Sequence, residues 1–202
     1  MADEERVRVH DVTLRGQTAR GAQICLRPMT EADWDLLYRW NSDPEVLYYA
    51  EGDDVDAYTP DEVRGIFGQI SQTAFCFIIE ADGVPVGECS LQAHNYERVL
   101  RQYPDLDCRR IDLSIGEKAR WGQGIGTETI RILTEYAFLE LGADLIYNCE
   151  IGDHNPRSKR AFQRVGYEIV AKIEQPPGSK GRVGYDLALT CEAYLKRSGA
   201  RS

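Results

Sequence analysis

Three alternating glycines, Gly122, Gly124 and Gly126, stand between a strand-like run and a helix-like run. The run before them, RIDLSIG (110–116), alternates apolar and polar residues with the two-residue period of a strand, and the run after them has apolar residues on one helical stripe. Glycines let a backbone approach a ligand, and the N–H groups of a helix's first turn favour an anion. The pattern predicts either an anion-binding loop or a tight strand–helix turn without a ligand.

Two common phosphate-binding loops do not fit this segment. A P-loop requires Lys and then Ser or Thr after its last glycine, but Gly126 is followed by Thr127 and Glu128. A dinucleotide-binding G-x-G-x-x-G counted from Gly122 would have to end in glycine at Thr127. Both classes of nucleotide site are therefore excluded.

The rest of the chain predicts helices and strands in mixed order. Turn and cap signals occur at Thr30, at Thr59-Pro60 and at Asp82-Gly83, with a polar loop between the first two. Further strands and helices are expected at 7–14 and 22–27 (a hairpin), 145–152, 155–165 and a terminal hairpin beyond Gly166. We expect an α+β (α/β/α) fold in one domain over 1–202, with 1–21 as an N-terminal strand or hairpin extension.

The charge balance and the cysteine content limit the kinds of partner and site that are expected. Asp and Glu outnumber Lys and Arg by 33 to 24, a formal net charge of −9, which argues against nucleic-acid and anionic-membrane partners. Six cysteines without a CxxC pair predict reduced thiols rather than disulfides or a metal site. Without an apolar leader or a run of about 18 apolar residues, the chain is expected to be cytoplasmic.

Two motifs carry a family resemblance. The segment RWGQGIGTETI (120–130) resembles the acetyl-CoA pyrophosphate loop of the GNAT superfamily of N-acetyltransferases. The segment NPRSKRAFQRVGY (155–167) resembles that superfamily's next motif, through Asn155, Ser158, Phe162, Gly166 and Tyr167. The resemblance covers roughly residues 22–192. It implies a GNAT-like, strongly bent mixed β-sheet flanked by helices, a central acetyl-CoA cleft, and acetyl transfer from acetyl-CoA as co-substrate.

The resemblance also implies where acetyl-CoA binds. The strand before the glycines would pair with the pantetheine arm, the glycine loop would bind the pyrophosphate, and the later motif would contact the arm. These cofactor-binding candidates are Ser114, Ile115, Trp121, Gly122, Gln123, Gly124, Ile125, Gly126, Thr127, Asn155 and Ser158. Asn155 also fits a helix N-cap ahead of Pro156, and the two roles are compatible.

Two positions depart from the superfamily pattern. Trp121 stands where Gln or Arg is common. Phe162 stands where a tyrosine is often proposed to protonate the leaving CoA thiolate. Phenylalanine cannot donate a proton, so this role is vacant, filled elsewhere or left to solvent, since a thiol has a pKa near about 8.5.

A general base is expected because an alkylammonium, with a pKa near about 10, must lose a proton before attack. Asp112 lies mid-strand, where an acid is disfavoured unless a partner or solvent satisfies it. RRIDLSI resembles the stretch bearing the proposed base of aminoglycoside 6′-N-acetyltransferases, which implies Asp112 as the catalytic base. Glu88 is the second candidate, and an Asp112 that merely faces solvent is the alternative.

The segment YYAEGDDVDAY (48–58), which is rich in acids and tyrosines, suggests which kind of molecule accepts the acetyl group. Acids there would attract a polycation and aromatic rings would contact it, although a solvated acidic surface remains the alternative. The substrate-binding candidates are Tyr49, Glu51, Asp53, Asp54, Asp56 and Asp153. We expect direct attack by a primary amine of an aminoglycoside-type small molecule, on a monomer or homodimer. The alternatives are N-terminal acetylation of a protein such as a ribosomal protein, and a catalytically silent acyl-CoA-binding domain.

Overall fold

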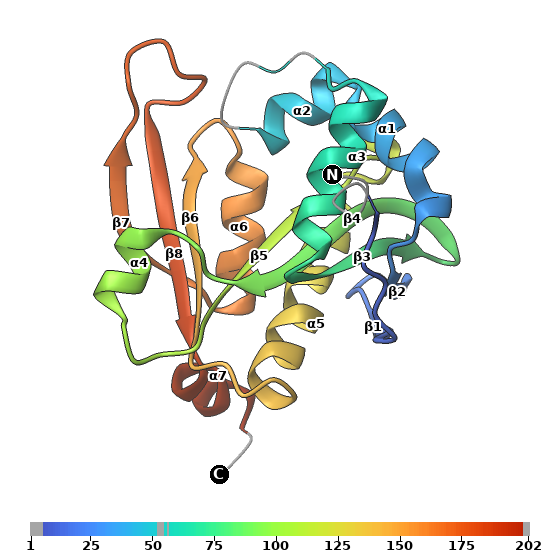
Figure 1. Cartoon of the computed structure of the whole chain (residues 1–202). Helices are drawn as coiled ribbons and strands as arrows, with labels where there is room; N and C mark the ends of the chain where they lie inside the picture. The colour runs from blue at the N-terminus through green and yellow to red at the C-terminus, as the bar shows by residue number, and fades with distance from the viewer. Residues whose placement is uncertain (1–5, 52–54, 56, 200–202) are drawn as a thin grey trace. The chain divides into compact units, whose positions relative to one another are not determined.

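The computed structural model describes residues 6–51, 55 and 57–199. The chain forms two compact units, the first of residues 1–90 and 112–129 and the second of residues 91–111 and 130–202. Strands β4 (Val84–Ala93) and β5 (Cys108–Ser114) and helix α5 (Ile125–Leu139) continue from one unit into the other (Figure 1). A single acetyltransferase domain over 1–202 stays a prediction.

Unit 1 holds strands in the order β1-β2-β3-β4. β1 pairs antiparallel with β2, and β2 antiparallel with β3. These strands are β1 (Leu14–Gln17), β2 (Gln23–Pro28) and β3 (Ala74–Ala81), together with β4. The unit also contains the helices α1 (Trp34–Asn41), α2 (Pro44–Ala50) and α3 (Pro60–Ser71) and the 3-10 turns η1 (Glu31–Asp33) and η2 (Lys118–Arg120).

Local chemistry explains several of these boundaries. Thr59 and Glu62 form a reciprocal capping box at the start of α3, with Pro60 at the first helical position. Asp82 and Gly83 have φ of 54° and 78°, as a tight hairpin between β3 and β4 requires. Apolar side chains of α1, α3 and β3 form one buried core cluster. The helix start at Thr59 and the Asp82-Gly83 hairpin were expected from the sequence and are confirmed, whereas the packing of these three elements was not predicted.

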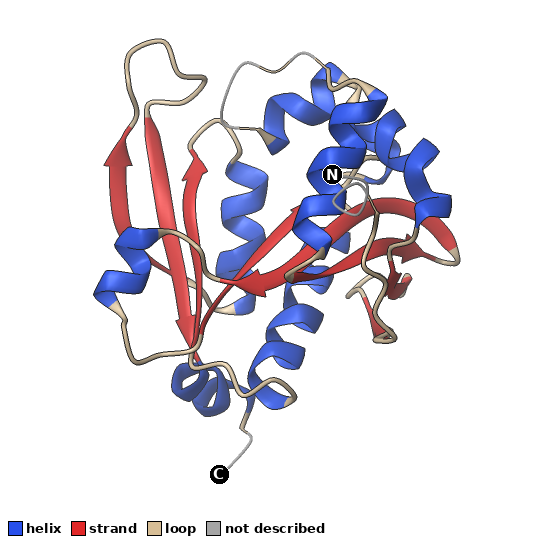
Figure 2. Ribbon diagram, viewed as in Figure 1, coloured by secondary structure: helices blue, strands red, loops and turns tan. Residues whose placement is uncertain are grey.

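Unit 2 holds strands in the order β5-β6-β8-β7. β5 pairs parallel with β6, and the other pairs are antiparallel, so the sheet is mixed, as expected (Figure 2). Its other elements are α4 (Glu97–Gln102), β6 (Leu145–Gly152), α6 (Pro156–Val165), β7 (Glu168–Glu174), β8 (Val183–Thr190) and α7 (Cys191–Ser198). The buried cluster of this unit includes Val99, Leu145 and Tyr147.

Three expectations need correction. Residues 7–13 are not a strand, because backbone N–H groups there bond to side chains instead: Arg8 N donates to Ser71 Oγ at 2.9 Å, and Val12 N donates to His10 Nδ1 at 3.3 Å. The segment expected to be a polar loop contains α2, whose first N–H groups are capped by Asp43. Helices α4 and α7 were not predicted. Among the described residues, no helix is long and apolar enough to span a membrane.

Candidate active site

The glycine loop has the geometry of an anion-binding turn. Gly122 and Gly124 have φ of 73° and 89°, a region that disfavours residues with a side chain. The bond from Glu128 N to Gly124 O, 3.0 Å long, closes the first turn of α5, so the earlier N–H groups have no partner within the helix. A Cβ on Gly122 would meet nothing within 4 Å. This open backbone at a helix start fits the pyrophosphate of acetyl-CoA.

Trp121 connects three parts of unit 1. Its indole Nε1 donates to Ile115 O at 2.6 Å, just beyond the end of β5. Its ring packs edge-to-face against Tyr49, with centroids 5.6 Å apart. Because Trp121 bonds to the residue that follows β5 and packs on Tyr49 of α2, an aromatic candidate for acceptor binding lies next to the glycine loop.

The segment between β5 and the glycine loop is held to α1 and α2 by contacts that the sequence did not predict. Glu117 accepts from Trp40 Nε1 at 2.9 Å and pairs with Arg39. Lys118 pairs with Asp43 at 2.7 Å and with Glu45 at 3.2 Å. The residues next to Trp40 and Lys118 in the sequence do not indicate these contacts. The partners lie far apart along the chain, and only the tertiary fold brings them together.

Both candidate bases lie in one electrostatic cluster of unit 1. Burial, followed by the negative charges of Asp112 and Glu51, raises the pKa of Glu88 to about 8. All three residues are partly buried. Burial, with Glu88 and Asp112 next in effect, raises the pKa of the Cys76 thiol to about 12, so this thiol stays protonated. The structure therefore groups Glu51, Glu88 and Asp112. Asp53, Asp54 and Asp56 lie outside the described residues.

In unit 2, the second motif starts and stabilises a helix. Asn155 Oδ1 accepts from Ser158 N at 3.1 Å, and Pro156 opens α6, so the N-cap interpretation is confirmed. Phe162 is buried and packs edge-to-face on Tyr167. Tyr167 in turn shares a 2.8 Å hydrogen bond with Thr134. Phe162 is thus a core residue of unit 2, while contacts of Asn155 and Ser158 with the pantetheine arm stay predictions.

Asp153 has a structural role that its sequence context did not indicate. Its Oδ1 accepts from Arg182 N at 3.0 Å, and its own N–H donates to Val183 O at 2.8 Å. The residue therefore holds the loop after β6 against the start of β8. Its proposed contact with the acceptor stays a prediction.

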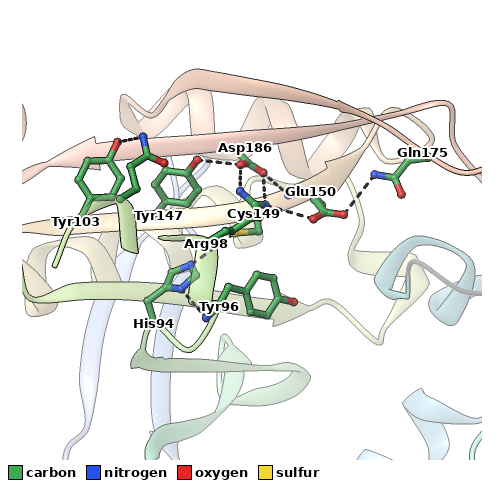
Figure 3. A network of polar contacts seen from close by, with 10 residues as sticks. His94, Tyr96, Arg98, Tyr103, Tyr147, Cys149, Glu150, Gln175 and Asp186 are labelled. Atoms are coloured by element: carbon green, nitrogen blue, oxygen red, sulfur yellow. Dashed lines mark hydrogen bonds and ion pairs between the residues drawn. The ribbon is translucent and has the colours of Figure 1, made fainter. Parts of the chain in front are cut away.

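A second carboxylate network lies in unit 2 around Asp186, whose side chain is fully buried (Figure 3). Asp186 accepts from Arg98, from Tyr147 Oη at 2.8 Å and from Glu150 N at 2.8 Å. Burial opposes ionisation, but the bonds from Arg98, Glu150 and Tyr147 outweigh it and lower the pKa of Asp186. The only sequence signal of this network is an aspartate inside the apolar run GYDLAL, from which no site was predicted.

Comparison with known proteins gives one family. Residues 23–168 match the family described as Acetyltransferase (GNAT) domain. Aminoglycoside N(6′)-acetyltransferase type 1 of Klebsiella pneumoniae is 21% identical over 159 residues, which cover 77% of this chain and 79% of that protein.

Solved structures have the same fold at low identity. The crystal structure of the aminoglycoside acetyltransferase AAC(6′)-Ib with coenzyme A and kanamycin has a TM-score of 0.72 and 21% identity, covering 88% of this chain and 99% of that one. Spermidine N-acetyltransferase from Vibrio cholerae with CoA and spermine has a TM-score of 0.69 and 17% identity, covering 85% and 98%. The expected mixed sheet flanked by helices is thereby confirmed.

Proposed function

The chain belongs to the GNAT family of acetyltransferases and uses acetyl-CoA, and on this premise we propose that it acetylates a primary amine of a polycationic small molecule. The observation that carries the acceptor class is the grouping of Glu51, Glu88 and Asp112 in unit 1. The negative charges of Asp112 and Glu51 raise the pKa of Glu88, and a cation would relieve this repulsion, so a ligand with several ammonium groups fits the cluster.

The proposed acetyl-CoA site is the backbone of Trp121 to Thr127. The left-handed glycines keep side chains away from this backbone, and the start of α5 offers N–H groups to the pyrophosphate. Bound acetyl-CoA supplies a thioester whose carbonyl carbon the amine attacks. A C–N bond forms, the C–S bond breaks, the attacking nitrogen releases its extra proton to solvent, and CoA leaves as a thiolate that solvent protonates.

We assign Asp112 as the general base. An ammonium group must lose its proton before it attacks, and a carboxylate that is ionised near pH 7 accepts that proton. Glu88, with a pKa raised to about 8, is mostly protonated at pH 7 and is therefore the poorer acceptor there.

The aromatic side of the proposed acceptor site is the Tyr49–Trp121 pair. The two rings meet edge-to-face at 5.6 Å, and Glu51 follows Tyr49 by two positions. Flat rings beside carboxylates suit both sugar rings and ammonium groups. The kanamycin and spermine in the two related structures are amines with several basic nitrogens, which supports the same acceptor class.

A screen of acceptors tests this function. The full-length protein is incubated with acetyl-CoA and, in turn, with aminoglycosides, polyamines, a monoamine and peptides with a free N-terminus, and released CoA thiol is measured. We expect turnover with polycationic small molecules well above that with the monoamine. Turnover only with peptides would favour the N-terminal acetylation of proteins. Tight acetyl-CoA binding without turnover on any amine would contradict an enzymatic role.

A further inference from the structure

The turn between β1 and β2 lies beside the glycine loop within unit 1. Thr18 closes this turn through two bonds to Ala22, one from its own N–H to Ala22 O at 3.0 Å and one from Ala22 N to its Oγ1 at 3.1 Å. The Thr18 side chain is buried, and its Cβ lies 3.9 Å from where a Cβ on Gly124 would be. The hairpin therefore covers one side of the loop at its left-handed glycine.

One hydrogen bond joins this hairpin to α5. Gln17 N donates to Glu128 Oε1 at 3.1 Å, across 111 positions of sequence. Glu128 is 8% exposed and belongs to the first turn of α5, directly after the loop. A buried carboxylate needs hydrogen-bond donors to offset its lost hydration, and the Gln17 N–H is one of them.

The charge of Glu128 would by itself work against the ligand. A carboxylate in the first turn is favourable to the helix dipole, but it repels a pyrophosphate that binds the same turn. A neutral residue would serve anion binding better, so the electrostatic contribution of Glu128 to the site is unfavourable. Its bond to Gln17 N gives this carboxylate a different role in the site.

We propose that Glu128 is a positioning residue for the acetyl-CoA loop, because its carboxylate ties the β1–β2 hairpin against Gly124 and keeps the loop backbone in the conformation that receives the pyrophosphate. This inference rests on the proposed acetyl-CoA site at residues 121–127. It adds the N-terminal hairpin to the elements on which co-substrate affinity depends. The hairpin acts through the loop and touches neither the amine nor the thioester.

Two pairs of variants separate the hydrogen bond from the charge. Glu128→Ala removes the acceptor, whereas Glu128→Gln keeps an acceptor oxygen and removes the charge. Gln17→Pro removes the N–H donor, whereas Gln17→Ala keeps it. β1 is an edge strand and Gln17 N–H points to Glu128, so a proline there takes no bond from the pairing with β2.

The measurement is the acetyl-CoA Kd by calorimetry, with kcat and the KM for the amine determined on the same preparations. We expect Glu128→Ala and Gln17→Pro to weaken acetyl-CoA binding roughly 10-fold, since a bond to a charged group is lost. The KM for the amine should stay within about 2-fold if the loop alone is affected. Glu128→Gln should bind acetyl-CoA at least as tightly as the parent. Gln17→Ala should bind acetyl-CoA more tightly than Gln17→Pro, because both variants lose the exposed bond from Gln17 Nε2 to Gly21 O but only the proline also loses the N–H that bonds to Glu128.

Two results would overturn the inference. Parent-like acetyl-CoA affinity in Glu128→Ala would show that the bond does not support the loop, and equal losses in Glu128→Gln and Glu128→Ala would show that the bond is not what matters. If Gln17→Pro does not fold, the two Glu128 variants decide alone. A Gly124→Val protein serves as the reference: if it binds acetyl-CoA like the parent, the proposed site itself is wrong, and if it alone loses binding, the site stands and only the role of Glu128 fails.

Discussion

The backbone N–H of Glu150 donates a 2.8 Å hydrogen bond to the buried carboxylate of Asp186, and Glu150 has a left-handed φ of 53°. The pairing of β6 with β8 shifts register between Asn148 and Ile151, so Glu150 lies in a bulge. A residue with a side chain is held in this conformation only by surrounding contacts. Asp186 supplies one of them and also binds Arg98 and Tyr147.

The first prediction concerns this network. Asp186→Ala should lower the free energy of unfolding by about 3 kcal/mol, because it leaves Arg98, Tyr147 and a backbone N–H without their acceptor. Asp186→Asn, which keeps one acceptor oxygen, should lose less. Urea denaturation measures both, with the exposed Glu192→Ala as a control expected to behave like the parent. Equal stability of Asp186→Ala and the parent would contradict the assigned role.

The pH dependence of stability should reveal Glu88. Its pKa in the folded protein, about 8, lies above the ordinary value of about 4.3, so between these pH values the native state binds more protons than the unfolded state. The contribution of Glu88 to the free energy of unfolding is therefore largest below about pH 4.3. It decreases as the pH rises toward about 8 and is lost above that value. Urea midpoints at pH 6 and pH 9 should differ less for Glu88→Gln than for the parent. An unchanged difference would argue against a raised pKa.

The assignment of the base can be tested by kinetics. Asp112→Asn should lower kcat at pH 7 by roughly 10²- to 10⁴-fold, with acetyl-CoA affinity unchanged. The loss should shrink as the pH approaches the pKa of the amine, where less of the acceptor needs deprotonation. Glu88→Gln should retain most of its activity at pH 7. A large loss in Glu88→Gln, with disappearance of an activity limb near pH 8, would instead make Glu88 the base.

Acceptor affinity should depend on Glu51. Glu51→Gln removes one charge of the cluster, so the KM for a polycationic amine should rise roughly 2- to 5-fold while kcat stays similar. Added salt should affect this variant less than the parent, and a monoamine should respond less than a polycation. The matched control is Glu31→Gln, an exposed acid at the start of η1. The same KM in both variants would remove Glu51 from the proposed acceptor site.

Co-substrate binding should be lost when Gly124 is replaced. Gly124→Val forces a branched residue into a φ of 89° and adds a side chain where the pyrophosphate is expected to approach. Calorimetry on the folded variant should detect acetyl-CoA binding weakened at least 10-fold. Gly65→Ala, at a helical glycine with nothing within 4 Å of an added Cβ, should bind like the parent.

Features that depend on a few neighbouring residues were predictable from the sequence. The capping box at Thr59, the Asp82-Gly83 hairpin and the N-cap at Asn155 follow from local backbone and side-chain chemistry. Gly122 and Gly124, just before α5, belong to the same class, because a left-handed turn at a helix start favours residues without a Cβ. The order of elements that defines the family was readable for this reason.

The strand expected at residues 7–14 failed for a tertiary reason over most of its length. Residues 7–13 alternate like a strand, yet their backbone bonds to Ser71 and the segment around it, and His10 Nε2 bonds to Cys76 O. Alternation of apolar and polar residues shows that a segment can pair as a strand, but it does not determine which segment it pairs with. Where side chains from a distant helix satisfy the backbone, no strand forms.

The chemistry of the candidate site depended on the fold. Glu88 is an ordinary carboxyl in the sequence, and only burial beside Asp112 and Glu51 raises its pKa. Glu128 bonds Gln17 across 111 positions, and Asp186 bonds Arg98 across 88. The sequence alone determined the elements that caps, turns and periodicity mark, because these signals act over a few residues, whereas α2, α4 and α7 were not predicted. The tertiary structure alone decided which charged groups meet, because hydration and Coulomb energy depend on distance in space rather than along the chain.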